Sequence, residues 1–153
     1  MTQALQASAS LATIADAKST APPLERECLS SLIDATHRYF DLMYDCDVSR
    51  FDQVFAPSVQ LHGYRDGQMM VWPAETYKEI LRKRQSPQSV NAPRLNEILT
   101  MDFVSTSMAL TKVRVRIVTM VFLDYLTWHS IDGRWLITSK GFHVESSDGA
   151  GGV

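Results

Sequence analysis

The feature of this chain that most restricts its fold is a hairpin sequence close to the C-terminus, residues 121–144, which read VFLDYLTWHSIDGRWLITSKGFHV. Two apolar-rich runs flank the dipeptide Asp132-Gly133, which is typical of a two-residue turn between antiparallel strands. In a turn of this kind Ile131 pairs with Arg134, and the remaining pairs follow by counting outward. The sequence therefore predicts both a hairpin and its register.

One face of this hairpin carries Trp128 and Trp135, and we assign that face to the interior because it holds most of the large apolar side chains. In the counted register Asp124 and His143 are diagonal neighbours on the same face, and Gly141 lies opposite Asp124. A carboxylate in an apolar cavity either finds a donor or has a raised pKa, which is how a general base is tuned. The pair could therefore act on a ligand, or it could be a structural link between the sheet and the first helix. A one-residue bulge would instead turn Asp124 outward.

The opposite face of the hairpin mixes polar and apolar side chains, which suits contact with a partner sheet better than a place in the core. We expect this face to form a homodimer interface, with exposure to solvent as the alternative. The residues assigned to the interface are Arg114, Arg116, Tyr125, Thr127, His129, Thr138 and Lys140.

The rest of the chain adds helices first and strands afterwards. Hydrophobic side chains recur at three- and four-residue spacing after Pro22-Pro23, which predicts a long amphipathic helix facing the core. The further expected elements are a short helix over 47–55 with Asp47 as its N-cap, a strand pair over 58–72 that turns at Asp66-Gly67, a helix over 73–84, and strands over 94–103 and 108–118. This order predicts an α+β fold with the helices on one face of an antiparallel sheet. We expect a single domain over residues 23–145, between a flexible arm over 1–22 and a flexible tail over 146–153.

Composition and charge argue against several classes of partner. A net charge of −2 disfavours nucleic-acid binding, which needs a concentrated basic surface. No apolar run reaches the roughly 18–20 residues of a membrane helix, and the N-terminus lacks a basic leader, so we expect no membrane segment and no signal peptide. Cys28 and Cys46 would lie about 27 Å apart on one helix, so we expect free thiols and a cytoplasmic location.

The sequence also lacks the common metal and cofactor signatures. The four histidines, His37, His62, His129 and His143, are not at metal-ligand spacing, and no HExxH or CxxC motif is present. There is no glycine-rich phosphate loop, dinucleotide fingerprint or GxSxG elbow either. We therefore expect neither a metal nor an organic cofactor.

Two longer segments carry a family resemblance, ATHRYFDLMYDCDVSRFDQVFAPSVQLHGYRDGQ and FLDYLTWHSIDGRWLITSKGFH. The first has a helix ending in Tyr-Phe, a short acidic helix and Phe-x-Pro before a strand; the second has Asp-Tyr-Leu, Asp-Gly-x-Trp and a closing Lys-x-Phe-His. Together, over about residues 25–144, they resemble the nuclear transport factor 2-like (SnoaL-like, ketosteroid-isomerase-like) superfamily, in particular its "putative lumazine-binding" branch. The resemblance implies a cone in which a curved antiparallel sheet wraps around a long N-terminal helix, with two shorter helices, one deep pocket and a dimer through the outer sheet face. One departure is the turn VTMV, which lacks the usual Gly or Pro and is expected to be longer or strained.

This superfamily contains both enzymes and binding modules, so two functions stay open. The first is a cofactor-independent protein that binds a small apolar ligand in its pocket, with acid–base isomerisation, dehydration or cyclisation as the reaction. Its candidate catalytic residues are Asp124, His143 and Tyr39, and its candidate ligand-binding residues are Phe40, Met43, His62, Leu126, Trp128, Trp135 and Ile137. The second is a non-catalytic dimeric binding or scaffold module, which predicts a cavity below about 300 Å³ and an Asp124 sealed in structural hydrogen bonds.

Overall fold

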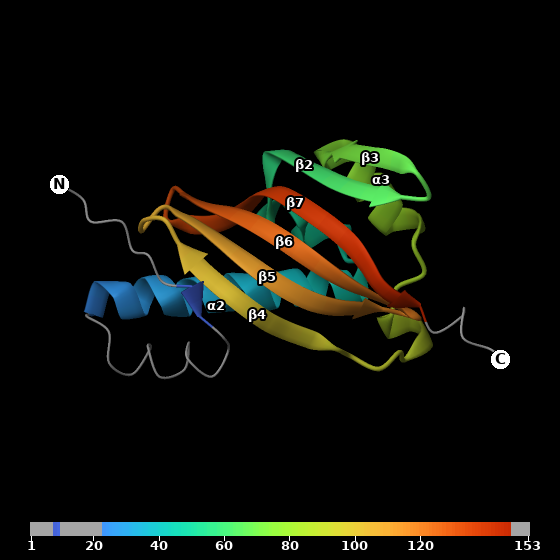
Figure 1. The fold of residues 1–153 in the computed structure, drawn as a ribbon, viewed down its shortest axis with the longest axis horizontal. Helices are drawn as coiled ribbons and strands as arrows, with labels where there is room; N and C mark the ends of the chain where they lie inside the picture. Colours follow the sequence, from blue (N-terminus) through green and yellow to red (C-terminus); the bar gives the residue numbers. More distant parts are fainter. Residues whose placement is uncertain (1–7, 10–22, 148–153) are drawn as a thin grey trace.

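The computed structural model describes residues 8–9 and 23–147 (Figure 1). Its elements are β1 (Ser8–Ala9), α2 (Pro23–Asp45), the 3₁₀ helix η1 (Val48–Gln53), β2 (Phe55–Arg65), β3 (Gln68–Pro73), α3 (Ala74–Lys83), the 3₁₀ helix η2 (Gln88–Val90), β4 (Asn96–Phe103), β5 (Met108–Ile117), β6 (Met120–Ile131) and β7 (Arg134–Ser147). This order confirms the predicted α+β fold. Apart from Ser8–Ala9, the arm expected over residues 1–22 lies outside the described residues, and so does the tail from residue 148. Strand β7 continues past the expected domain boundary at residue 145.

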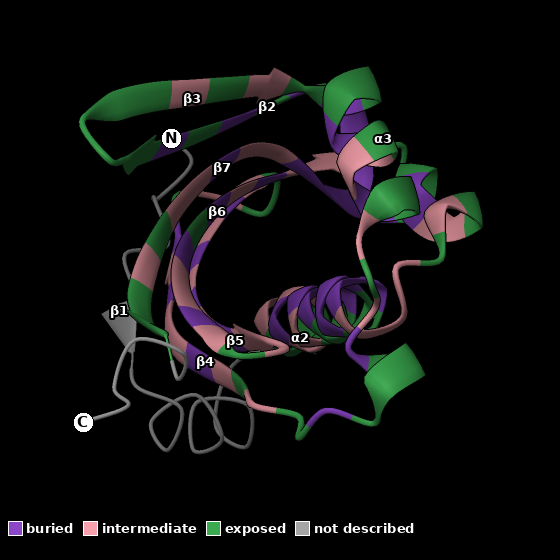
Figure 2. Ribbon diagram, turned by 90° about the vertical axis from the view of Figure 1, so that its right-hand side faces the viewer, coloured by how far each residue is buried: buried purple, intermediate pink, exposed green. Residues whose placement is uncertain are grey.

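The strands form one curved, open sheet that wraps around α2 (Figure 2). The strand order is β1-β4-β5-β6-β7-β2-β3, so strands from the two ends of the domain meet where β2 lies beside β7. Neighbouring described strands are antiparallel except for β2 and β7, which are parallel. This parallel pair departs from the predicted all-antiparallel sheet. Pairing between strands so far apart in the chain leaves no local pattern in either strand.

Helix α2 fills the concave side of the sheet. Its apolar stripe is buried as the periodicity predicts, and Leu32, Tyr39 and Met43 are inaccessible to solvent. The helix ends where Cys46 takes a left-handed conformation with φ 55°, and the N–H of Cys46 donates to the carbonyl of Leu42 at 2.9 Å. A stripe of this width packed against a concave sheet is what makes α2 the centre of the core.

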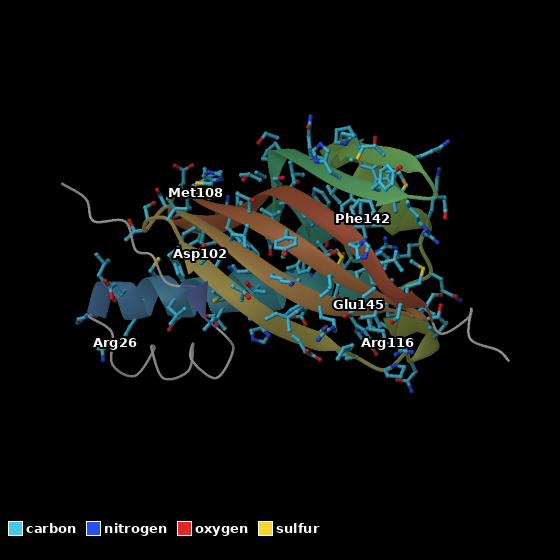
Figure 3. All side chains as sticks on the ribbon, in the orientation of Figure 1. Arg26, Asp102, Met108, Arg116, Phe142 and Glu145 are labelled. Carbon is cyan, nitrogen blue, oxygen red and sulfur yellow. The ribbon has the colours of Figure 1, made fainter. Side chains whose placement is uncertain are left out.

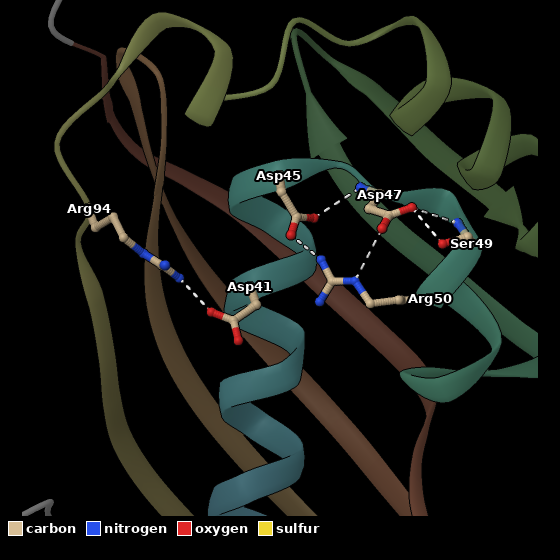
Figure 4. A network of polar contacts seen from close by, with 6 residues as sticks. All are labelled: Asp41, Asp45, Asp47, Ser49, Arg50 and Arg94. Carbon is tan, nitrogen blue, oxygen red and sulfur yellow. Dashed lines mark hydrogen bonds and ion pairs between the residues drawn. The ribbon is translucent and has the colours of Figure 1, made fainter.

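Charged side chains fasten the end of α2 to the segments around it (Figure 4). Asp47 caps η1 as predicted, because its carboxylate accepts a backbone N–H two residues further on at 3.1 Å. Arg50 pairs with both Asp45 and Asp47. Arg94, just before β4, donates to Asp41 at 2.8 Å. Partly exposed pairs of this kind contribute little stability each, and their role is to orient the loops at this end of the helix.

Three of the described hairpins turn on two residues. Asp66-Gly67 and Asp132-Gly133 have the same geometry, with φ 52° at the aspartate and 77° at the glycine, as the Asp-Gly pattern predicts. The turn between β5 and β6 places Val118 at φ 56°. A β-branched side chain is strained in this left-handed region, which confirms the strain expected of this turn.

A β-bulge in β7 changes the register of the C-terminal hairpin. The pairing follows the counted register from the turn as far as Trp128 and Ile137. The next pair is Thr127 with Ser139, which leaves Thr138 as an extra residue. Because side chains alternate between faces, every residue of β7 beyond Thr138 lies on the face opposite to the predicted one.

Two predicted positions are wrong for this reason. Lys140 was expected on the outer interface, but it points into the interior and is 4% exposed. His143 was expected inside beside Asp124, but it is exposed on the outer face. Asp124 itself points inward as predicted, since the bulge lies in the neighbouring strand, and it pairs with Phe142 instead of Gly141.

The interior satisfies most of its polar groups and contains no disulfide among the described residues. Trp128 Nε1 donates to Thr111 Oγ1 at 2.9 Å, so the buried indole N–H has a partner. Cys28 and Cys46 are free thiols, as expected. Within residues 8–9 and 23–147, no helix combines the length and the apolar character needed to cross a bilayer.

Candidate functional site

A cluster of buried polar side chains lies between α2, α3 and the sheet. The Lys140 ammonium on β7 donates to the hydroxyl oxygens of Tyr39 and Tyr77, at 2.9 and 3.3 Å. Tyr39 donates in turn to Asp124 Oδ2 at 2.5 Å, and Lys140 Nζ lies 3.4 Å from the same oxygen. Side chains from α2, α3, β6 and β7 therefore converge on one ammonium group.

Burial controls the electrostatics of this cluster. Burial first, and then the negative charge of Asp124, raise the pKa of Tyr39 well above 10, so Tyr39 is a neutral hydrogen-bond donor at neutral pH. The ring centroids of Tyr39 and Tyr77 lie 5.1 and 5.2 Å from Lys140 Nζ, which adds cation–π attraction. Asp124 Oδ1 is buried and has no hydrogen-bond partner among the described residues. A buried carboxylate with one unsatisfied oxygen costs free energy, and functional sites often carry such groups.

A cavity of about 320 Å³ lies beside the cluster. It is enclosed by the β2–β3 hairpin, the C-terminal end of α3, the residues around the β5–β6 turn and the second half of β7. Lys140 and Tyr77 form part of its wall, whereas the described lining does not include Tyr39 or Asp124. A ligand in the cavity would therefore meet the ammonium of Lys140 and not the carboxylate behind it.

Aromatic rings make up one wall of the cavity. Trp72 on β3 stacks on Phe142 with a centroid separation of 5.0 Å and on Tyr77 with a separation of 6.2 Å. Figure 3 labels Phe142 on β7, on the part of the strand that faces the β2–β3 hairpin. Gly63 on β2 makes room for this ring, because a Cβ at that position would lie 2.1 Å from the Phe142 side chain. The wall thus offers flat apolar surface for stacking.

The other polar groups of the cavity are basic. Arg84 follows α3 directly, and its Nη1 is buried without a hydrogen-bond partner among the described residues. Arg65 lies at the exposed edge of the cavity. In the described part of the chain, no group of three or more His, Cys, Asp or Glu side chains could hold a metal ion. Amines, guanidinium groups and phenols are hydrogen-bond donors, so the site suits a ligand with acceptor atoms.

The structure brings together only some of the residues proposed from the sequence. Of the candidate catalytic residues, Tyr39 and Asp124 are in contact, and His143 lies on the other face of the sheet. The candidate ligand-binding residues packed in the core are Phe40, Met43, Leu126, Trp128, Trp135 and Ile137. His62 is exposed and borders a smaller hollow of about 250 Å³ on the outer face of the sheet. None of these seven residues lines the larger cavity, and ligand contact at these positions stays a prediction.

Sequence reasoning missed four residues of the site, Lys140, Tyr77, Trp72 and Arg84. A signal existed for Lys140, which belongs to the closing Lys-x-Phe-His motif. Tyr77 was assigned to the apolar edge of its helix, which is correct but gives no hint of its hydroxyl contact. The positions of Trp72 and Arg84 depend on how the β2–β3 hairpin and α3 fold against β7.

The outer face of the sheet carries the remaining residues of the expected dimer interface. Arg114 donates to Glu145 at 2.7 Å and to Glu97 at 2.8 Å, and this contact lowers the pKa of Glu145. Figure 3 labels Glu145 on β7. His129 Nδ1 and Thr138 Oγ1 are 2.6 Å apart across the β6–β7 pair. These contacts tie the strands together, and the dimer interface stays a prediction.

A curved sheet wrapped around a long helix is the architecture of nuclear transport factor 2-like proteins. An NTF2-like protein of unknown function from Silicibacter pomeroyi DSS-3 has a TM-score of 0.67 and 18% sequence identity, covering 79% of this chain and 98% of that chain. An NTF2-like protein of unknown function from Shewanella baltica OS155 has a TM-score of 0.70 and 16% identity, covering 84% and 100%. A third, from Methylobacillus flagellatus KT, has a TM-score of 0.62 and 18% identity, covering 77% and 92%. At these identities the similarity shows the fold alone.

The family follows from the sequence itself. The family model described as "putative lumazine-binding" matches residues 28–143, which is most of the chain, and the protein belongs to this family. The comparison with curated proteins found no match.

Proposed function

We propose that this protein binds a small, planar, mostly apolar ligand in the cavity beside Lys140. The observation that carries the proposal is the cavity itself, whose volume of about 320 Å³ is just above the lower limit of about 300 Å³ for small-molecule sites. Its wall combines stacked aromatic rings with a small number of inward donors, which is the usual composition of a ligand site.

The polar groups of the cavity support a ligand with hydrogen-bond acceptors. Lys140 and Tyr77 both reach the cavity wall, and the contact between them, at 3.3 Å, is the longer of the two that the ammonium makes to hydroxyl oxygens. A ligand oxygen or ring nitrogen could accept from either group at little cost to the cluster. Tyr39 and Asp124, behind Lys140, hold its ammonium in place.

The family description suggests a first compound to test. Lumazine is a planar bicyclic pteridine with two carbonyl oxygens. A ring of this kind could stack against Trp72 while a carbonyl accepts a hydrogen bond from Lys140. We extend this ligand class to the present chain as part of the proposal.

Proton transfer is the reaction class that the same arrangement supports, with isomerisation, dehydration or cyclisation as its forms. Lys140 would be the group that exchanges a proton with the ligand, because it lines the cavity. Tyr39 and Asp124 would act through Lys140 as positioning residues. This chemistry needs no cofactor, and two free thiols are consistent with a cytoplasmic location.

Native mass spectrometry of freshly purified protein, followed by isothermal titration with lumazine, tests the binding function. We expect a bound small molecule, or saturable lumazine binding that Trp72→Ala weakens by at least about tenfold, since a base–aromatic stack contributes about 1–3 kcal/mol. Tyr125→Ala on the outer face is the matched control and should leave binding unchanged. A protein that carries no ligand and binds no planar aromatic compound at millimolar concentration would contradict the proposal.

A non-catalytic dimeric module is the second candidate function. Two observations favour it: Asp124 Oδ2 is held in hydrogen bonds within the core, and Tyr125 on the outer face is 51% exposed. The same native mass spectra would show the dimer mass. Tyr125→Glu should convert the dimer to a monomer, because a charge at the centre of an apolar contact has no partner there. A monomer at all concentrations in the unmodified protein would exclude this candidate.

A further inference from the structure

The charge of the cavity restricts its ligand further than its shape does. The ionisable groups in its described lining, tyrosines aside, are Arg65, Arg84 and Lys140, and there is no carboxylate among them. Lys140 is balanced by Asp124 behind it at 3.4 Å. The cavity therefore has an excess of positive charge that no lining residue neutralises.

Arg84 is the source of this excess. No carboxylate of the described residues forms an ion pair with its guanidinium, whose Nη1 is buried and unpartnered. The neighbouring thiol of Cys46 does not neutralise it, since burial raises the pKa of Cys46 and keeps the thiol protonated at neutral pH. A buried guanidinium nitrogen without an acceptor is unfavourable, and an acceptor in the cavity would remove that penalty.

Arg84 also has a structural explanation that must be separated from a binding role. It is the C-cap of α3, and a basic side chain is favoured near the carbonyl end of a helix. Arg82 and Lys83, in the last turn of the same helix, share that advantage, but both are exposed and outside the cavity lining. Only the Arg84 side chain combines the helix end with the cavity wall.

We propose that the cavity selects planar aromatic ligands that carry an anionic group, a carboxylate or an ionised ring oxygen. This inference rests on the proposed binding function and names its substrate class. The anionic group lies against the Arg84 guanidinium, whose planar fork suits two acceptor oxygens. The ring lies along Trp72 and Phe142, and the ammonium of Lys140 adds a second positive charge on the same side.

Two probes of the same shape and different charge test the proposal. Isothermal titration at pH 7 compares 2-naphthoate with its neutral isostere 2-naphthamide. We expect 2-naphthoate to bind at least about tenfold more tightly, the effect of one charge-assisted hydrogen bond. Arg84→Gln should abolish this preference by weakening only the anionic probe. Arg82→Gln removes the same charge from an exposed position on the same helix, where Arg82 pairs with Glu79, and should leave the preference intact.

The outcomes separate the inference from the proposed function. Equal binding of both probes, or a preference that survives Arg84→Gln, overturns anion selection while the binding function stands. Failure of both probes to bind overturns both. Should Arg84→Gln fail to fold by circular dichroism, Arg84→Lys keeps the charge but loses the planar fork, and it should reduce the preference for 2-naphthoate without abolishing it. An unchanged preference in Arg84→Lys would then show that only the field of the helix end, and not the guanidinium, selects the anion.

Discussion

The ammonium of Lys140 lies 3.4 Å from Asp124 Oδ2, and the two side chains are 5% and 1% exposed. A buried ion pair is favourable only when hydrogen bonds satisfy both partners. Here Tyr39 connects them, since it accepts from Lys140 at 2.9 Å and donates to Asp124 at 2.5 Å. The three side chains therefore depend on one another, and each can be tested by removing its part of the network.

Lys140→Met should lower the free energy of unfolding by about 3–5 kcal/mol, because it leaves the buried charge of Asp124 without its partner. The double variant Lys140→Met with Asp124→Leu should recover most of that loss, since no charge stays in the core. Urea denaturation of the two single variants and the double variant measures the coupling. Losses that simply add would contradict a coupled pair.

Tyr39→Phe should cost about 1.5–3 kcal/mol at neutral pH, the contribution of a hydrogen bond to a charged group. It should also change the pH dependence of stability. The pKa of Tyr39 is raised in the folded protein, so above pH 10 the unfolded chain loses this proton first. The stability that comes from keeping Tyr39 neutral is complete below about pH 10 and is lost as the pH rises further.

Urea denaturation between pH 9 and pH 11 measures this effect. The unmodified protein should lose stability with pH more steeply than Tyr39→Phe, by up to about 1.4 kcal/mol per pH unit. Tyr125→Phe, at an exposed position, is the matched control and should follow the unmodified protein. Parallel curves for all three proteins would show that Tyr39 titrates normally.

Gly63→Ala should destabilise the protein by about 1–3 kcal/mol, because the new Cβ would overlap the ring of Phe142 and force it to move. The same movement should disturb the Trp72 stack and weaken ligand binding in the cavity. Gly141→Ala on the adjacent strand is the control, since its Cβ would meet nothing closer than 3.9 Å. Thermal unfolding followed by circular dichroism distinguishes the two, and equal shifts would contradict the steric explanation.

Val118→Asn should stabilise the protein by about 1 kcal/mol, because asparagine tolerates the left-handed conformation that strains valine. The reciprocal change, Asp132→Val, places valine at the corresponding position of another turn, where φ is 52°, and should destabilise by a similar amount. The two changes in unfolding free energy should have opposite signs. A destabilised Val118→Asn variant would mean that the valine side chain makes a contact that outweighs the strain.

The sequence by itself determined the helices and strands, the Asp132-Gly133 turn and the inward direction of Asp124. These properties depend on neighbours within a few residues, through periods of 3.6 and 2.0 and through turn residues with positive φ. The stripe of α2 and the tryptophan face of β6 have enough apolar side chains to fix which side is buried.

The tertiary structure decided the rest of the site. The bulge at Thr138 has no distinct local pattern, yet it turns Lys140 inward and His143 outward because side chains alternate strictly along a strand. The cavity forms where β3, α3 and β7 meet, and its Trp72, Arg84 and Lys140 come from segments that are distant in the sequence. Their convergence depends on long-range packing, which the pattern within any single segment does not contain.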